Sequence, residues 1–522
     1  MKKLVSLFLA LILVMSCTAA LGEITYPLTT EPVTITIAVA QHDMDVVEDF
    51  NTKYAIADAE KVTGIHINWI PIIEGNTTEK VATMLAGDLP DVFLGLLNDT
   101  MIMQNPSLFV PTEDLIETCC PNIYRTYEES IDGWRTFLTY PDGHIYGLIA
   151  NYRAAYNNGI DGTMWIRQDW LDNLGLQMPT TLNELEKVLI EFRDKDADNN
   201  GDPNDEIPWD WCQKHYAAKW YEVAHMFGST LEENGMFDIV DGKVIDAARS
   251  DTLRTVLEYM NHLCKEGLLN IEGLTQENDQ YTANIASGKV GVFTGWAPYT
   301  YTADSELQAK FVSVGPVAAE GCTYRTMPNK LTANRCGFVI TSACKNVELA
   351  LKWWDYLSRD VVATHCARSG PEGLTWEMKD GVPTSRLYTA EEATAFGYGD
   401  LAGHAGTSAF AASMGLTNCP PLIVNSLAPA PGTTSAIRYE AVKTYEPFFT
   451  EQVMSKGVVP AEAQEEFDFT CEGLEDAINA YAADAILNGV TDENWNAYLK
   501  TLDSLNYDYY IEFYQKKLDG NW

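Results

Sequence analysis

The chain has 522 residues and a formal net charge of −39, and 46% of its residues are hydrophobic. A chain of this length is too long to fold around one hydrophobic core, so we expect two or three globular domains. Nucleic acids and anionic membrane surfaces would repel so negative a chain. The charge therefore argues against both as partners, and it leaves neutral sugars and cationic ligands open.

Residues 1–22 are predicted to be a signal peptide rather than part of the fold. A pair of lysines gives this segment a positive start, and the apolar run that follows is too short to span a bilayer. Two cleavage positions stay open. Residues 14–17 (VMSC) resemble a lipobox with Cys17 as the lipidated residue, whereas residues 20–22 suit ordinary cleavage before Glu23. We favour the first, which predicts an exported lipoprotein that touches the membrane only through its lipid; the second predicts a secreted soluble protein.

Strand and helix patterns alternate through the first hundred residues. The predicted elements are, in chain order, a strand at 34–40, a helix at 46–63, a strand at 65–70, a helix at 77–86 and a strand at 92–97. This order and spacing predict parallel βαβ units and therefore an α/β sheet.

The rest of the chain contains further helices and two short buried strands, and its C-terminal part is mostly helical. The predicted helices are 165–174, 182–193 with a capping box of Thr181 and Glu184, 251–266, 346–357 and the tail 495–517, and the strands are 290–294 and 337–340. Trp353 and Trp354 share the apolar side of their helix, which predicts a place in the core.

An acidic loop with metal-ligand spacing follows the helix at 182–193. Its oxygen-bearing residues are Asp196, Asp198, Asn200, Asp202, Asp205 and Glu206. Ca²⁺ takes six to eight oxygen ligands, and alternating Asp and Asn around a glycine can wrap one ion. The EF-hand pattern is only partly met, because Ile207 stands where the closing Glu belongs. We predict one structural Ca²⁺ in an EF-like loop; the alternative is a solvated acidic turn.

The same region begins a series of segments that resemble one known family. The segments are WIRQDWLDNLGLQMPTTLNELEKVL from residue 165, MLAGDLPDVF from 84, YPDGHIYGL from 140, YMNHLCKEGLLN from 259, ASGKVGVFTGW from 286 and SGPEGLTWEMKDG from 369. By their number and their order along the chain, these segments resemble family 1 of the extracellular solute-binding proteins of bacterial ABC importers. The resemblance is greatest to the large lipoprotein branch that includes alginate-binding proteins.

The resemblance implies a two-lobed α/β fold of the periplasmic binding protein type with a helix-rich C-terminal part. Chain crossings are expected near residues 150, 310 and 362. The expected lobes are 30–150 plus 312–361 for lobe 1, and 151–311 plus 362–522, with the helical tail, for lobe 2.

Candidate ligand residues follow from the chemistry of sugars, whose apolar C–H faces stack on aromatic rings while polar side chains hold the hydroxyls. The resemblance places a stacking Trp296 at the cleft, with core packing as the alternative, and GPEGLTW matches a Gly-x-Glu-Gly motif at the cleft edge. The expected ligand-binding residues are Trp296, Tyr299, Glu372, Trp376, Trp165, Arg167 and Tyr146. Arg167 has a second interpretation, an ion pair with Asp169 or another nearby acid.

The predicted function is capture of an oligosaccharide in an inter-lobe cleft by a monomeric protein that delivers it to an ABC permease. No Gly-x-Ser-x-Gly elbow, Walker loop, Rossmann glycine pattern or HExxH helix occurs in the sequence, so we expect no enzyme. Two alternatives stay open: a secreted glycoside-processing enzyme, and a binding protein for peptides or another solute.

Ten cysteines follow Cys17 without a CxxC pair, so zinc is not expected and no disulfide can be assigned.

Overall fold

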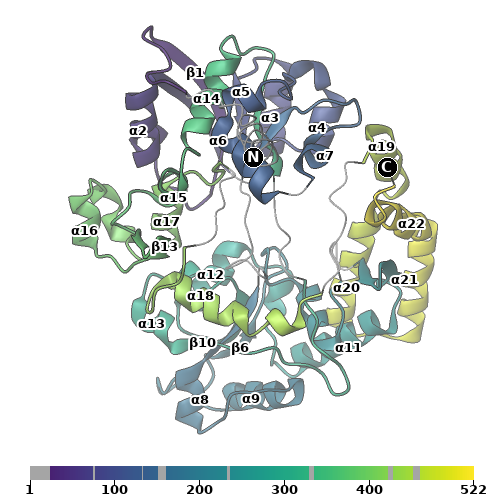
Figure 1. Cartoon of the computed structure of the whole chain (residues 1–522). Coiled ribbons are helices and arrows are strands. Elements are labelled where there is room, and N and C mark those ends of the chain that lie inside the picture. Colours follow the sequence, from purple (N-terminus) through teal and green to yellow (C-terminus); the bar gives the residue numbers. More distant parts are fainter. Residues whose placement is uncertain are drawn as a thin grey trace, which may run out of the picture. The chain divides into compact units, whose positions relative to one another are not determined.

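The computed structural model describes residues 24–73, 77–131, 133–150, 160, 162–231, 236–327, 334–420, 427–450 and 459–521. The chain divides into two compact units, each with its own main sheet (Figure 1). Unit 1 comprises Met1–Tyr152, Ala333–Pro371 and Met414–Leu422, and unit 2 comprises Arg153–Thr332, Glu372–Ser413 and Ile423–Trp522. The predicted signal peptide and Cys17 lie outside the described residues. In the described part of the chain, no helix has both the length and the apolar character to cross a bilayer.

Unit 1 is built on a five-stranded sheet that confirms the predicted βαβ units. Its strands, in spatial order, are β2 (Ile65–Ile73), β1 (Val33–Gln41), β3 (Val92–Leu94), β11 (Asn334–Ile340) and β4 (Gly147–Ala150). β1 pairs in parallel with both β2 and β3, whereas β11 runs antiparallel to β3 and β4. β3 stops at Leu94, earlier than predicted, because Gly95 takes a positive φ of 72° that ends the extended backbone.

Helices cover this sheet, and segments far apart in the sequence share its core. Green α14 and α15 lie among the purple and blue N-terminal elements in Figure 1. Trp353 and Trp354 of α14 are fully buried, as predicted, and Trp354 stacks on Phe338 of β11 at 4.7 Å between ring centroids. The helices are α2 (Tyr54–Thr63), α3 (Thr77–Ala86), α4 (Asp99–Gln104), α5 (Ile116–Cys119), α6 (Pro121–Ser130), α7 (Trp134–Leu138), α14 (Val347–Tyr356) and α15 (Val361–Ser369).

The first helix of unit 1 starts later than predicted. Lys53 has an extended backbone and precedes α2, and its ammonium forms a buried ion pair with Asp45 at 2.9 Å. Pairing a charge that would otherwise be buried alone outweighs the helical pattern of residues 46–53, of which only the 3-10 turn Phe50–Thr52 is formed.

Unit 2 contains a four-stranded sheet with the order β10 (Phe311–Ser313), β5 (Thr163–Arg167), β9 (Val290–Gly295) and β6 (Ile207–Asp210). β6 and β9 are parallel, and β5 is antiparallel to both of its neighbours. The prediction of helix from residue 165 is wrong for its first turn. Residues 163–167 form a central strand with all five side chains buried, and α8 (Gln168–Leu174) follows. Hydrogen-bonded pairing of this segment with β9 and β10 stabilises an extended backbone more than the local sequence pattern stabilises a helix.

The predicted helix before the acidic loop is α9 (Leu182–Asp194). Thr181 caps it by accepting a hydrogen bond from the Glu184 backbone N–H at 3.2 Å, whereas the Glu184 carboxylate accepts from Thr180 rather than closing the predicted box on Thr181. The acidic loop therefore joins a capped helix to strand β6.

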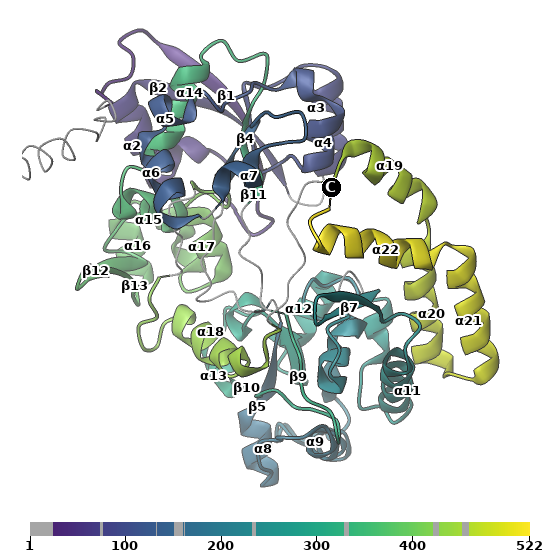
Figure 2. The same ribbon diagram turned by 45° about the vertical axis from the view of Figure 1, so that its right-hand side comes forward.

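The remaining elements of unit 2 include two hairpins and a C-terminal helical block. α20 lies against α11 and α22 against β8 (Figure 2), so the C-terminal helices pack on the rest of unit 2. The helices are α11 (Asp251–Lys265), α12 (Asn278–Ala286), α13 (Ser305–Lys310), α16 (Ala390–Ala395), α17 (Ser408–Met414, whose last residue falls in unit 1), α18 (Thr434–Lys443), α19 (Ala461–Thr470), α20 (Leu474–Asn488), α21 (Asp492–Ser504) and α22 (Tyr507–Leu518). The hairpins are β7 (Phe237–Val240) with β8 (Lys243–Asp246), and β12 (Trp376–Lys379) with β13 (Val382–Ser385).

Three chain segments fall in the other unit from the one we expected. Residues 312–332 belong to unit 2, because β10 pairs with β5 along Val312↔Ile166. Residues 362–371 belong to unit 1, where α15 packs against α2. Residues 414–422 also belong to unit 1, whereas we expected them in lobe 2.

Candidate functional site

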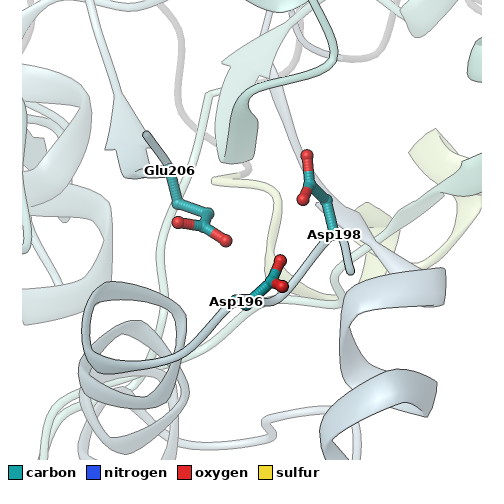
Figure 3. Close-up of side chains that lie close together, drawn as sticks. All are labelled: Asp196, Asp198 and Glu206. Atoms are coloured by element: carbon teal, nitrogen blue, oxygen red, sulfur yellow. The ribbon is translucent and has the colours of Figure 1, made fainter. Parts of the chain in front are cut away.

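Three carboxylates converge in the acidic loop between α9 and β6. One oxygen from each of Asp196, Asp198 and Glu206 lies within 4.8 Å of the others (Figure 3). One Glu206 oxygen accepts a hydrogen bond from the Ala197 N–H at 2.7 Å. Its other oxygen, Oε2, is buried and accepts no hydrogen bond from the residues that the structure describes. A buried carboxylate oxygen without a donor is costly unless a cation or a proton satisfies it.

The backbone of the loop holds the aspartates in place. The Asn200 N–H donates to Asp196 Oδ1 at 2.9 Å and to Asp198 Oδ1 at 3.0 Å, and the Gly201 N–H donates to Asp196 Oδ2 at 2.9 Å. Gly201 has a φ of 95°, a conformation that favours glycine and lets the loop turn back on itself.

The other three predicted ligands make different contacts. Asp205 pairs with Lys289 at 3.1 Å, and the Lys289 and Asn200 hydrogen bonds lower its pKa. Asn200 Oδ1 accepts from the Asp202 N–H at 2.7 Å, and Asp202 Oδ1 accepts from the Asn204 N–H at 3.2 Å. The structure thus brings together half of the predicted set.

The electrostatics of the loop match this geometry. Burial, and then the negative charges of Asp198 and Asp205, raise the pKa of Glu206. The converging atoms are all carboxylate oxygens, which suit a hard divalent cation rather than zinc or copper.

A second group of polar and aromatic residues lies where β9 ends. Trp296 directly follows β9 and is partly exposed, and its indole N–H donates to the Tyr299 hydroxyl at 2.9 Å. The Arg438 guanidinium lies 4.1 Å from the centre of the indole ring. One face of Trp296 is therefore held by a cation–π contact.

Arg438 comes from α18 and is 1% exposed. Its guanidinium donates to the Trp296 carbonyl at 2.9 Å, to the Thr163 hydroxyl at 3.1 Å and to the Ile160 carbonyl. The planar fork of an arginine suits such multiple contacts. Arg438 thus ties α18 to the ends of β5 and β9 and restrains the indole.

Three predicted ligand residues are buried, which contradicts their assignment to a binding surface. Trp376 pairs with Ser385 in the β12–β13 hairpin and is 0% exposed, so its ring has no face for a sugar. Trp165 is buried in the central strand and donates to the Gly295 carbonyl at 3.2 Å. Arg167 is buried and forms two hydrogen bonds of 2.7 Å with Asp169, which confirms the alternative interpretation.

Glu372 and Tyr146 have different surroundings. Glu372 is exposed and accepts a hydrogen bond from the Met378 N–H at 3.1 Å, which leaves it accessible. Tyr146 is buried in unit 1, and its hydroxyl donates to Asp142 at 2.7 Å. Of the predicted ligand residues, Trp296, Tyr299 and Glu372 keep some exposed surface.

Comparison with known proteins identifies the family. Residues 46–363 match the model of the bacterial extracellular solute-binding proteins. The chain belongs to this family. It is 30% identical to the fructooligosaccharide ABC transporter substrate-binding protein FusA of Streptococcus pneumoniae over 318 residues, 59% of this chain and 58% of FusA. It is 26% identical to lipoprotein LipO of Bacillus subtilis over 253 residues, 47% of this chain and 49% of LipO. The chain therefore matches about half of the length of these curated relatives.

Solved structures of two-lobed solute-binding proteins share the fold over nearly the whole chain. FusA of S. pneumoniae in complex with kestose has a TM-score of 0.79 at 23% identity and covers 93% of this chain and 99% of its own. An EF-hand mutant of FusA in complex with fructo-nystose has a TM-score of 0.78 at 23% identity, with the same coverage. The alginate-binding protein AlgQ2 without calcium ion has a TM-score of 0.70 at 18% identity and covers 94% and 99%.

In this solute-binding protein, sequence reasoning missed Arg438 and the aromatic loop after β6. Arg438 contacts Trp296 across 142 positions, and no local pattern links the two. The loop could have been noticed from its sequence HYAAKWY at 215–221, in which His215 and Tyr216 are adjacent.

Proposed function

We propose that the chain is the substrate-binding component of an ABC importer, and that it binds an oligosaccharide and releases it unaltered. Membership of the solute-binding family and likeness to FusA support this proposal. The observation that carries it is Trp296, an aromatic ring that is partly exposed and held on one face by Arg438. A restrained aromatic ring binds the C–H face of a sugar with little loss of entropy.

The rest of the site is proposed around this ring. The Tyr299 hydroxyl accepts a hydrogen bond from the indole N–H of Trp296. The exposed carboxylate of Glu372 is available to accept a hydrogen bond from a sugar hydroxyl. A bound ligand would favour the conformation in which these groups contact it, as in hinge-closing binding proteins. The lipid anchor at Cys17, export and delivery to permease subunits belong to the same proposal, and the lipoprotein relative LipO supports the anchor.

We also propose that the acidic loop holds one structural Ca²⁺. Support comes from the three converging carboxylates and from the buried Glu206 oxygen that accepts no hydrogen bond from the described residues. Solved relatives include an EF-hand mutant and a protein described as without calcium ion. Asn200, Asp202 and Asp205 would complete the coordination, Asp205 after release from Lys289. The ion would fix the junction between α9 and β6.

The proposal is tested by thermal unfolding of the purified chain with a panel of fructans, alginate fragments, milk oligosaccharides and peptides. We expect at least one oligosaccharide to raise the melting temperature, and mass spectrometry to recover it intact. Shortened sugars in the incubated sample would favour the glycoside-processing enzyme. Stabilisation by peptides alone would favour the other alternative.

A further inference from the structure

A pair of aromatic residues stands out in the loop that follows β6. Tyr216 is 52% exposed, and its ring centre lies 4.4 Å from that of His215, with 35° between the ring planes. His215 itself is buried. An exposed tyrosine is thus backed by a buried ring.

The position of His215 is fixed by hydrogen bonds and by packing. The Ala217 N–H donates to Nδ1 at 3.1 Å, so the proton is on Nε2, which donates to the Tyr301 hydroxyl at 3.2 Å. Its ring also lies 5.2 Å from that of Tyr281. Burial lowers the pKa of His215 to about 4, so the ring is neutral near pH 7. Tyr216 therefore rests on a rigid, uncharged support.

This support lies at the same sheet edge as Trp296. β6 and β9 run in parallel, with Asp210 opposite Phe293, so their carboxyl ends meet at one edge. Tyr301, which receives the His215 hydrogen bond, packs so closely on Gly295 that a Cβ there would lie 2.0 Å from its hydroxyl. Gly295 immediately precedes Trp296. In open α/β sheets, ligands bind outside the carboxyl ends of the strands.

We infer that Tyr216 is a second stacking platform for the oligosaccharide, and that His215 is a positioning residue that holds it. The inference rests on the proposed function and extends it. An uncharged ring pair takes the C–H face of a neutral or acidic sugar ring alike, so it adds affinity without selecting charge. With Trp296 it would give the site two aromatic contacts and hence a preference for ligands longer than one sugar.

The experiment measures dissociation constants by titration calorimetry for kestose, an alginate trisaccharide and a milk tetrasaccharide. For the probe that binds the wild type most tightly, Tyr216→Ala should weaken binding about 5- to 30-fold, as expected for loss of an aromatic stack and its buried area. Tyr216→Phe should stay within about twofold, because the ring is retained. Tyr54→Ala is the matched control, since Tyr54 is 47% exposed on α2, and it should bind as the wild type does.

A double-mutant cycle separates positioning from general stability. His215→Ala should weaken binding in the wild type but change it little in the Tyr216→Ala background, because His215 acts through Tyr216. Equal losses in both backgrounds would contradict the positioning role. If the wild type binds and Tyr216→Ala binds equally well, the inference is wrong and the proposed function stands. If the wild type binds none of the probes, both are wrong.

Discussion

Replacement of Glu206 by Gln tests the acidic loop, because it should change stability in opposite directions with and without calcium. Without a cation, the change removes one of three carboxylates whose oxygens lie within 4.8 Å of one another. Coulomb's law at an effective dielectric constant of about 20 gives about 3 kcal/mol for each such pair, and partial exposure reduces the net effect to about 1 kcal/mol. The calcium-free variant should therefore melt about 1–2 °C above the calcium-free wild type, because a unit of this size has a large entropy of unfolding.

With calcium, the order should reverse. A ligand at a hundredfold excess over its Kd stabilises the folded form by about 2.7 kcal/mol, which raises the wild-type melting temperature by about 4 °C. Glu206→Gln should lose most of this increment, because a neutral amide oxygen is a weaker ligand than a carboxylate.

The assay is calorimetric unfolding in chelator and in millimolar CaCl₂, with Asp194→Asn as the control that removes an exposed charge at the end of α9, next to the loop but outside the proposed ligand set. This control should keep most of the calcium response. A wild-type curve that is the same in chelator and in calcium, with no bound calcium by elemental analysis, would show that the loop is a solvated acidic turn without a metal ion.

Three further predictions concern packing, pH and export. Arg438→Met removes the guanidinium that donates to the Trp296 and Ile160 carbonyls, so calorimetry should find unit 2 less stable by about 3 kcal/mol, with Arg438→Lys recovering only part of this. Burial raises the pKa of Asp355 to about 6, so its contribution to stability should be lost as pH rises from about 4 to about 6. Urea unfolding across this range should give a flatter profile for Asp355→Asn, and equal slopes would contradict the argument. Cys17→Ala should lose fatty-acid label in cells; an unlabelled wild type would instead support ordinary cleavage.

The sequence predicted the elements whose patterns are local. The strand and helix periods of residues 34–94 predicted the order of the elements, because β1 and β3 are runs of mostly buried residues and β2 alternates buried with exposed side chains. The acidic loop was recognisable because its acidic residues are spaced along one turn. Trp353 and Trp354 were assigned to the core from one helical face.

The errors arose where distant segments decide the structure. Trp165 lies in a strand because β9 and β10 pair on both sides of it, and neither partner is visible from residues 163–167. Trp376 resembled a cleft residue in its motif, but its side chain is fully buried. Arg438 had no local signal, because its partners are more than a hundred positions away. Side-chain exposure depends on tertiary packing, so a family motif alone did not identify which aromatic rings stay accessible.

The most direct test of the central claim is calorimetric titration of the wild type, Trp296→Ala and Phe469→Ala with the oligosaccharides of the panel. Phe469 is 85% exposed on α19 and serves as the matched aromatic control. We expect saturable binding of an oligosaccharide that is recovered intact. We also expect an affinity about 5- to 150-fold lower in Trp296→Ala, from a loss of about 1–3 kcal/mol, and no change in Phe469→Ala. Wild-type binding that Trp296→Ala leaves unchanged, or cleavage of the sugar, would contradict the proposed function.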